Sequence, residues 1–119
     1  MDKDCTIYKT VDFIGKRWTV LILLELYKGK QNWKRYSEIK KCMGTITPKM
    51  LSERLKELES QKMIEKRIDS SQVPIKCEYS LTNSGLDFIK IIKDIKKWAL
   101  KWNIKNTVCA NSNCKHCTL

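Results

Sequence analysis

The sequence lacks most of the groups from which enzyme active sites are built. It contains a single histidine, His116, and its 4 glycines are dispersed, so there is no glycine-rich phosphate-binding loop. No pair of carboxylates is spaced for acid–base chemistry either. We therefore expect a protein that is not an enzyme.

Long apolar runs and a targeting segment are also missing. The most apolar stretch, Trp18 to Leu26, is too short and too interrupted to span a bilayer. The opening residues Met1-Asp2-Lys3-Asp4 are polar, unlike a secretory signal. We therefore expect a cytoplasmic location. In that reducing compartment, the 6 cysteines indicate metal ligation, redox sensing or core packing rather than a disulfide framework.

Acidic residues are few relative to basic ones. The 119 residues include 24 basic and 13 acidic side chains, a formal net charge of +11. The length suits one compact domain, and the hydrophobic and charged fractions of 42% and 31% are those of a globular protein. The positive excess favours a polyanionic partner, with nucleic acid the commonest; an anionic membrane surface and plain solubility are the alternatives.

Caps and periodicity divide the chain into helices followed by a hairpin and a last helix. Helices are predicted over residues 6–14, 18–27, 37–42 and 48–61, with glycines after the first three and Ser37 capping the third. Thr47-Pro48 gives the clearest start, an N-cap hydroxyl followed by proline at the first helical position. Strands are predicted over 63–68 and 75–81, and Thr82 caps a helix that reaches roughly Lys105.

This order predicts a mainly α-helical fold with a small antiparallel β-hairpin, a winged helix–turn–helix. In the second strand, Cys77, Tyr79 and Leu81 alternate with polar residues, which predicts one buried and one solvated face. We divide the chain into a DNA-binding and dimerisation domain, residues 1–107, and a cysteine-rich tail, residues 108–119.

The helix over 48–61 is the predicted recognition helix. Leu51, Leu55 and Leu58 form one apolar stripe that faces the core, and a short hydroxyl with long cations lies opposite, near the positive end of the helix dipole. The segment from Lys28 to Arg67 holds 12 basic and 5 acidic residues, a net +7. An ordinary solvated helix face is the alternative interpretation.

The hairpin turn over 69–76 is the predicted wing, which we expect to contact the DNA backbone or minor groove beside the recognition helix. Arg54, at the edge of the apolar stripe, is assigned a phosphate contact or a packing role. The candidate DNA-contacting residues are Tyr36, Ser37, Lys40, Lys41, Thr47, Lys49, Met50, Ser52, Glu53, Arg54, Lys56, Lys66, Arg67 and Lys76.

Several segments resemble the HxlR family of regulators. They are Gly15-Lys16-Arg17-Trp18-Thr19, Tyr36-Ser37-Glu38-Ile39, the stretch from Ile46 to Glu59, and Glu78-Tyr79-Ser80-Leu81-Thr82, together with Cys5 and Trp98. The resemblance implies a dimeric winged-helix regulator that binds a palindromic operator and often answers redox or electrophile signals. The chain departs from the family in the added residues Lys30 to Lys34, in Lys62 where a glycine is usual, and in Thr6 where a proline is usual.

The last helix carries a candidate dimer seam. Apolar residues there repeat at spacings of 3, 4, 3 and 4, which is typical of a heptad interface. A second apolar face, with Leu86, Ile89 and Ile92, is available for the helix's own domain. We therefore expect a homodimer built from the first and last helices, with the seam formed by Phe88, Ile91, Ile95, Trp98 and Trp102.

The cysteine tail has two competing interpretations. Cys109, Cys114 and Cys117 provide three ligands for zinc or an iron–sulfur cluster, with Cys5 as a candidate fourth. The same four residues are candidates for redox or electrophile sensing, by a disulfide between Cys5 and a tail cysteine or by trapping an electrophile. Inert thiols are the third possibility, and Cys42 and Cys77 are expected to be core fillers.

Two other functions remain open. Cys114-Lys-His-Cys117 has the spacing of a dithiol redox pair, but that pair normally begins a helix in a βαβ setting, which is absent here. A winged helix can also contact protein or RNA rather than duplex DNA.

Overall fold

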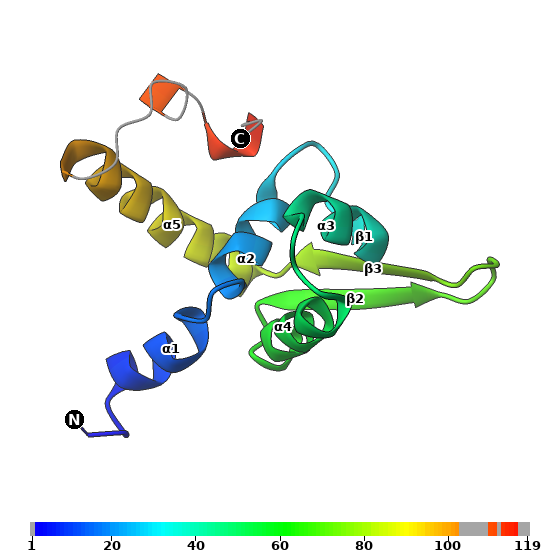
Figure 1. Cartoon of the computed structure of the whole chain (residues 1–119), viewed down its shortest axis with the longest axis horizontal. Helices are drawn as coiled ribbons and strands as arrows, with labels where there is room; N and C mark the ends of the chain where they lie inside the picture. Colours follow the sequence, from blue (N-terminus) through cyan, green and yellow to red (C-terminus); the bar gives the residue numbers. More distant parts are fainter. Residues whose placement is uncertain (1, 103–109, 112, 117–119) are drawn as a thin grey trace.

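The computed structural model describes residues 2–102, 110–111 and 113–116. Its elements follow the predicted order with two additions, the short strand β1 and the 3-10 turn η1 in the tail (Figure 1). They are α1 (Thr6–Ile14), α2 (Thr19–Tyr27), β1 (Lys34–Arg35), α3 (Tyr36–Met43), α4 (Pro48–Ser60), β2 (Ile64–Asp69), β3 (Lys76–Leu81), α5 (Asn83–Trp102) and the 3-10 turn η1 (Cys114–His116). The predicted winged helix–turn–helix fold is confirmed. In the described residues, no helix has the length and apolarity needed to cross a membrane.

The helix starts and stops mostly follow the expected chemistry. The Thr47 side chain accepts a hydrogen bond from the backbone N–H of Met50 at 3.1 Å, and Pro48 occupies the first helical position. Gly44 ends α3 at a φ of 71°, in the left-handed region that glycine tolerates best. The prediction that Ser37 caps α3 is wrong, because the helix begins at Tyr36 and its N-cap, Arg35, makes no side-chain cap bond.

The sheet differs from a simple hairpin. β1 pairs with β3, so the strand order is β1-β3-β2 and β3 is central. Glu78 and Ser80 are consequently buried along with Tyr79, and the prediction of a solvated face on this strand is wrong. A strand of two residues is too short to show a hydrophobic period, which is why the sequence did not predict β1.

The core is built between α2, α4 and the inner face of α5. Ile22 and Leu23 are fully buried in α2. They lie in one cluster with the predicted apolar stripe of α4, Leu51, Leu55 and Leu58, and with the α5 residues Ile89 and Ile92. By contrast, α1 contributes no buried residue. The domain thus fixes α4 firmly on its apolar side and leaves the opposite side of that helix in solvent.

The end of α4 is formed without glycine. Lys62 adopts a φ of 61°. Its N–H donates to the carbonyl of Glu59 at 2.9 Å, and the N–H of Met63 donates to the carbonyl of Leu58 at 3.0 Å. This is the Schellman pattern, which usually places glycine at the left-handed residue. Lysine therefore adopts here a backbone conformation that its Cβ disfavours.

Candidate nucleic-acid interface and neighbouring surfaces

The outer face of α4 presents the predicted recognition residues to solvent. Lys49, Ser52, Glu53 and Lys56 are all exposed, as are Thr47 and the predicted α3 residues Ser37 and Lys41. Met50 and Lys40 are half-buried. The helix carries 3 basic and 3 acidic residues and is therefore neutral by itself. Any attraction for phosphate must come from Lys49 at its start and from the basic residues of the elements around it.

Tyr36 connects the two helices of the helix–turn–helix. Its hydroxyl lies 3.1 Å from the carbonyl oxygen of Pro48, to which it donates, and 3.3 Å from Oγ of Ser52. The contact joins the first turn of α3 to the first turns of α4. Tyr36, a predicted DNA-contacting residue, thus holds α4, the predicted recognition helix, at the turn that carries Ser52.

Arg54 takes part in an ion-pair cluster on the inner edge of α4. Its guanidinium lies 2.6 Å from Glu57 Oε1, and Lys16 Nζ lies 3.0 Å from the same oxygen. Burial alone would raise the pKa of Glu57, but the hydrogen bonds from Lys16 and Arg54 outweigh it and hold the pKa below its ordinary value. The Arg54 side chain is only 13% exposed, so its geometry fits the packing role considered for it.

The wing extends away from the helices as a two-stranded ribbon (Figure 1). Lys66 is exposed on β2. Arg67 is held on two sides, because its guanidinium stacks 4.2 Å from the Trp33 ring centroid and its Nε lies 3.0 Å from Glu78 Oε1. Lys76 Nζ lies 3.6 Å from the other carboxylate oxygen of Glu78. Two of the three predicted wing cations are therefore partly neutralised.

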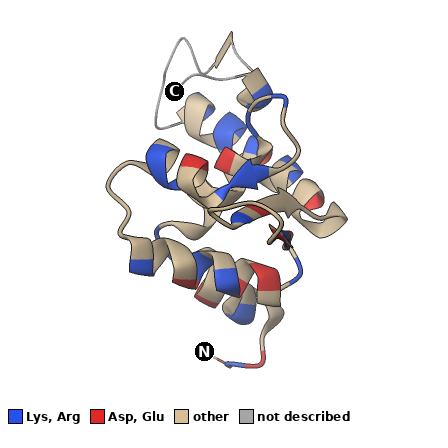
Figure 2. Ribbon diagram, turned by 90° about the vertical axis from the view of Figure 1, so that its right-hand side faces the viewer, with Lys and Arg blue, Asp and Glu red and all other residues tan. Residues whose placement is uncertain are grey.

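The turn of the wing is organised by its own polar groups. Asp69 accepts hydrogen bonds from the side chain and the backbone N–H of Ser71, and these bonds lower the pKa of its carboxyl. Viewed from the wing side, Lys and Arg positions lie on helices above and below the hairpin, and acidic positions are interspersed with them on these helices (Figure 2). The positive charge is distributed over several elements rather than concentrated on α4.

Two structural residues near this interface were not predicted. Lys34 extends to the end of α2, where its ammonium donates to the carbonyls of Glu25 and, at 2.6 Å, Lys28. Burial lowers the pKa of Lys34 against the opposing pull of Glu25. Glu78 is the second, because it orders Arg67 and Lys76 from the central strand. The sequence shows neither arrangement, because the Lys34 contacts depend on how the chain returns from α2 to β1 and the Arg67–Glu78 contact depends on the register of β2 and β3.

The predicted dimer seam divides into an inner and an outer part. Phe88 is half-buried and packs against the domain core. The other four predicted residues point away from it, with exposed fractions of 50% for Ile91, 53% for Ile95, 58% for Trp98 and 67% for Trp102. Ile89 and Ile92 are buried on the inner face, as expected, whereas Leu86, which was predicted to share that face, is 45% exposed.

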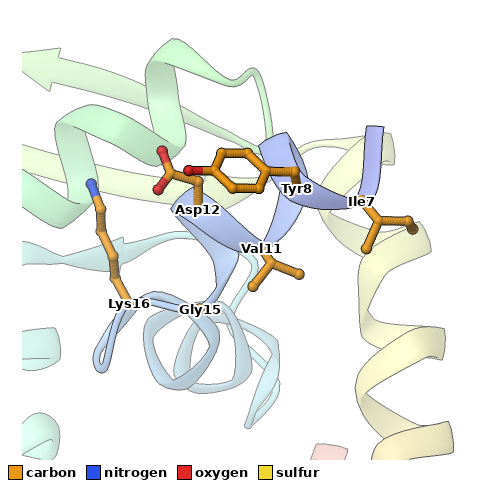
Figure 3. A pocket seen from close by; sticks show the side chains of 6 residues that line it. All are labelled: Ile7, Tyr8, Val11, Asp12, Gly15 and Lys16. Atoms are coloured by element: carbon orange, nitrogen blue, oxygen red, sulfur yellow. The ribbon is translucent and has the colours of Figure 1, made fainter. Parts of the chain in front are cut away.

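A shallow groove of about 540 Å³ runs beside α1, bordered by Ile7, Tyr8, Val11, Asp12, Gly15 and Lys16. Figure 3 shows Ile7 and Val11 pointing to one side of the helix, with Tyr8 and Asp12 on the other. Ile7 and Val11 are 68% and 57% exposed. The first and last helices therefore both carry uncovered apolar faces.

The cysteines fall into different environments. Cys5 is half-buried and precedes α1, Cys77 is half-buried in β3, and Cys114 is buried in η1. Cys42 is exposed, which contradicts the prediction that it fills the core. Cys109 and Cys117 lie outside the described residues, so the tail ligand set stays a prediction. Within the residues that the structure describes, no group of three or more His, Cys, Asp or Glu side chains is arranged to hold a metal.

Comparison with known proteins agrees with the helix–turn–helix fold described above. The family model for HxlR-like helix-turn-helix proteins matches residues 13–107. The HTH-type transcriptional regulator YvaP of Bacillus subtilis is 42% identical over 94 residues, which cover 79% of this chain and 83% of YvaP.

Solved structures agree with the sequence matches. A MarR-family transcriptional regulator of Porphyromonas gingivalis W83 is 32% identical with a TM-score of 0.74, over 87% of this chain and 97% of that one. The reduced form of the regulator YodB of B. subtilis is 32% identical with a TM-score of 0.72, over 86% and 97% of the two chains. YodB has also been solved after diamide treatment and with quinone bound.

Proposed function

The chain belongs to the HxlR-like helix-turn-helix family of transcriptional regulators, and from this premise we propose that it binds double-stranded DNA as a homodimer with α4 in the major groove. The observation that carries the proposal is the outer face of α4. It presents Lys49 and Ser52 on the first turns of a helix whose start is capped by Thr47 and fastened by Tyr36. The N-terminal turns of such a helix are the part that meets base edges.

The side chains of α4 and those of the elements beside it have complementary roles. Ser52 offers a short donor and acceptor for a base edge, and Lys49 offers a mobile cation. On one flank, Lys40 and Lys41 of α3 are suited to backbone phosphates, and on the other Lys66 of the wing is an exposed cation. Phosphate contacts fix the register, so specificity rests on the few side chains of α4.

Binding to DNA duplexes tests this proposal. One probe is a duplex selected from a random pool, and the second is the upstream region of the protein's own gene. Lys49→Ala and Ser52→Ala are expected to weaken binding to the selected duplex about 5- to 100-fold while leaving the fold unchanged by circular dichroism. Lys49→Ala is also expected to reduce the salt slope by about one if the lysine contacts a phosphate. Lys90→Ala, which removes an exposed lysine of α5, is the matched control. Equal binding of the wild type to every duplex and to heparin contradicts the proposal.

The homodimer is proposed from the uncovered faces of α1 and α5. Four large side chains of α5, two of them tryptophans, lie half to two-thirds exposed along one line, and Ile7 and Val11 of α1 are exposed as well. A second copy buries such a surface at a favourable free energy of roughly 25 cal/mol per Å². An isologous contact also matches the two-fold symmetry of a palindromic operator.

The proposed dimer can be tested with two matched isoleucine substitutions in the same chain. Ile95→Asp is expected to convert the dimer to monomer in light scattering at micromolar concentration. Ile75→Asp changes an isoleucine of similar exposure, 63% against 53%, in the wing loop, and is expected to leave the dimer intact. A monomeric wild type, or equal effects of the two substitutions, contradicts the proposed seam.

We further propose that a cysteine gates DNA binding. Cys5 lies at the start of α1, next to the proposed dimer surface, so that an adduct or a disulfide there would alter the packing of the two copies. The diamide-treated and quinone-bound structures of YodB support this class of signal. Diamide is expected to abolish binding of the wild type, dithiothreitol to restore it, and Cys5→Ser to remove the response. Cys42→Ser, which changes an exposed thiol on α3, is the control, and an unchanged response of Cys5→Ser refutes the role of Cys5.

A further inference from the structure

Much of the positive charge of the chain lies outside the recognition helix. The segment from Lys28 to Arg35, which follows α2, contains 4 basic residues and no acidic one, a net +4. α5 contains 5 lysines and 2 aspartates, a net +3, whereas α4 is neutral. Together, residues 28–35 and α5 supply more than half of the net charge of +11. This charge is available for a contact with a polyanion that α4 does not make.

The fold brings lysines of three segments together at the end of α2. The N–H of Gly29, in the loop after α2, donates to the carbonyl of Lys115 in η1 at 2.8 Å. Lys115 Nζ lies 4.9 Å from the ring centroid of Tyr27, the last residue of α2, and Lys93 Nζ of α5 lies 5.0 Å from the same centroid. The loop after α2, the turn η1 and α5 therefore present their basic residues around one aromatic ring.

A groove of about 400 Å³ continues this surface between α5 and the tail. Lys93, Lys96 and Lys97 line it from α5, and Asn111 and Asn113 line it from the tail. Lysine ammonium groups and asparagine amides are both common donors to the phosphate oxygens of nucleic acids. The groove therefore has positive charge on one side and amide donors on the other. We call Lys30, Lys93, Lys96, Lys97 and Lys115 the distal basic surface.

The charge of the distal basic surface is not neutralised by the domain itself. Lys30 and Lys97 are exposed, and Lys93 Nζ donates to the uncharged hydroxyl of Tyr27 at 2.9 Å. Among the described residues, no carboxylate lies within salt-bridge distance of Lys93, Lys97 or Lys115. A polyanion that binds here therefore does not have to displace an internal carboxylate from these three lysines.

The length of α2 separates the distal basic surface from α4. Lys16, shortly before the start of α2, pairs with Glu57 of α4, whereas Tyr27 at the end of α2 contacts Lys115. Figure 1 shows η1 at the top of the molecule and α4 in its lower part. A duplex bound by α4 therefore leaves the distal basic surface uncovered.

The proposed dimer leaves this surface uncovered as well. At about 3.6 residues per turn, Lys93 and Lys97 lie on a different side of α5 from the seam residues Ile91 and Ile95. Two-fold symmetry then gives each dimer two distal basic surfaces in addition to its two α4 helices. One dimer therefore has separate surfaces for two partners.

We propose that the distal basic surface binds the sugar–phosphate backbone of a second DNA segment, so that one dimer holds two duplexes. A polyanion with regularly repeated charges can contact lysines of three segments at once, which a single carboxylate cannot. The donors are those of backbone contacts rather than of base readout, so this contact is independent of DNA sequence. The two-duplex complex rests on the proposed binding through α4, whereas the backbone contact at the distal basic surface does not.

Capture of a second duplex tests the two-duplex complex. The selected duplex is immobilised, the full chain is bound to it, and a fluorescent duplex of scrambled sequence is then added. The wild type is expected to retain the fluorescent duplex, with retention falling steeply between about 50 and 200 mM salt. The double variant Lys97→Gln/Lys115→Gln is expected to retain at least about fivefold less while it still binds the immobilised duplex. Lys3→Gln/Lys9→Gln removes two exposed lysines near the N-terminus, with the same change in charge, and is expected to behave as wild type.

Fluorescence anisotropy of the scrambled duplex with the chain alone tests the surface without operator recognition. The slope of log affinity against log salt is expected to fall by about two in Lys97→Gln/Lys115→Gln, by about one in Lys97→Gln alone, and not in Lys3→Gln/Lys9→Gln. An unchanged slope in the double variant overturns the distal basic surface.

The remaining outcomes separate this inference from the proposed function. A wild type that holds the immobilised duplex but retains no second one overturns the two-duplex complex and leaves binding through α4 intact. Preferential retention of single-stranded RNA of the same length overturns the assignment to duplex DNA. If the chain does not prefer the selected duplex, binding through α4 fails, and the salt slopes still decide whether the distal basic surface contacts DNA.

Discussion

Lys62 gives a sharp test of the backbone argument, because it holds a left-handed conformation that glycine adopts at no steric cost. The residue is exposed, and among the residues that the structure describes its side chain takes part in no ion pair. Its backbone, however, closes α4 and also accepts the hydroxyl of Thr82 at 2.7 Å, which joins this turn to the start of α5. Lys62→Gly therefore removes the strain at Cβ and keeps every backbone contact.

The magnitude follows from two opposing terms. A non-glycine residue in the left-handed region costs roughly 1–2 kcal/mol. Glycine offsets part of this gain, because it loses about 0.5–1 kcal/mol more conformational entropy on folding. The expected net effect is an increase of about 0.5–1 kcal/mol in the free energy of unfolding. For a chain of this length, that corresponds to a rise in Tm of roughly 2–5 °C.

Urea unfolding followed by circular dichroism at fixed protein concentration measures this difference, since a dimer's apparent stability depends on concentration. Lys62→Ala is the matched control, because it removes the same charge and the same long side chain but keeps Cβ. We expect the midpoint to rise for Lys62→Gly only, with an unchanged m-value. Equal midpoints for the two variants, or a less stable glycine variant, would refute the strain argument.

Three further perturbations test other parts of the fold. Gly85→Ala places a Cβ against the backbone carbonyl that precedes β2 and is expected to cost about 1–3 kcal/mol in urea unfolding, whereas Ser84→Ala next to it is expected to be nearly neutral. Because the pKa of Glu57 is lowered in the folded state, its contribution is present at neutral pH and lost as pH falls; the stability gap between wild type and Glu57→Gln should close below about pH 4, and a constant gap contradicts the ion-pair cluster. Lys34→Met leaves the carbonyls at the end of α2 without their ammonium and is expected to lower the free energy of unfolding by about 1–2 kcal/mol, with Lys30→Met as the exposed control; equal loss for both excludes a capping role.

Local chemistry accounts for the parts of the molecule that the sequence determined alone. The start of α4 was predictable because Thr47 and Pro48 act within their own turn, and its inner face because three leucines repeat at helical spacing. The outer residues Lys49 and Ser52 followed from the same geometry. The apolar outer face of α5 was also visible, since its side chains lie on one line whatever the domain does.

Tertiary structure decided what depends on contacts between distant segments. β1 exists because Lys34 and Arg35 lie beside Tyr79 and Glu78, a pairing that no local period reveals. It makes β3 central and buries Glu78, which then holds Arg67. The residues that Tyr36 and Trp33 contact are likewise far away along the chain. Sequence therefore set the helices, the two longer strands and the outward face of α4. Packing set β1, and it set which cations stay available and which are held, because an ion pair or a stack needs a partner that only the fold supplies.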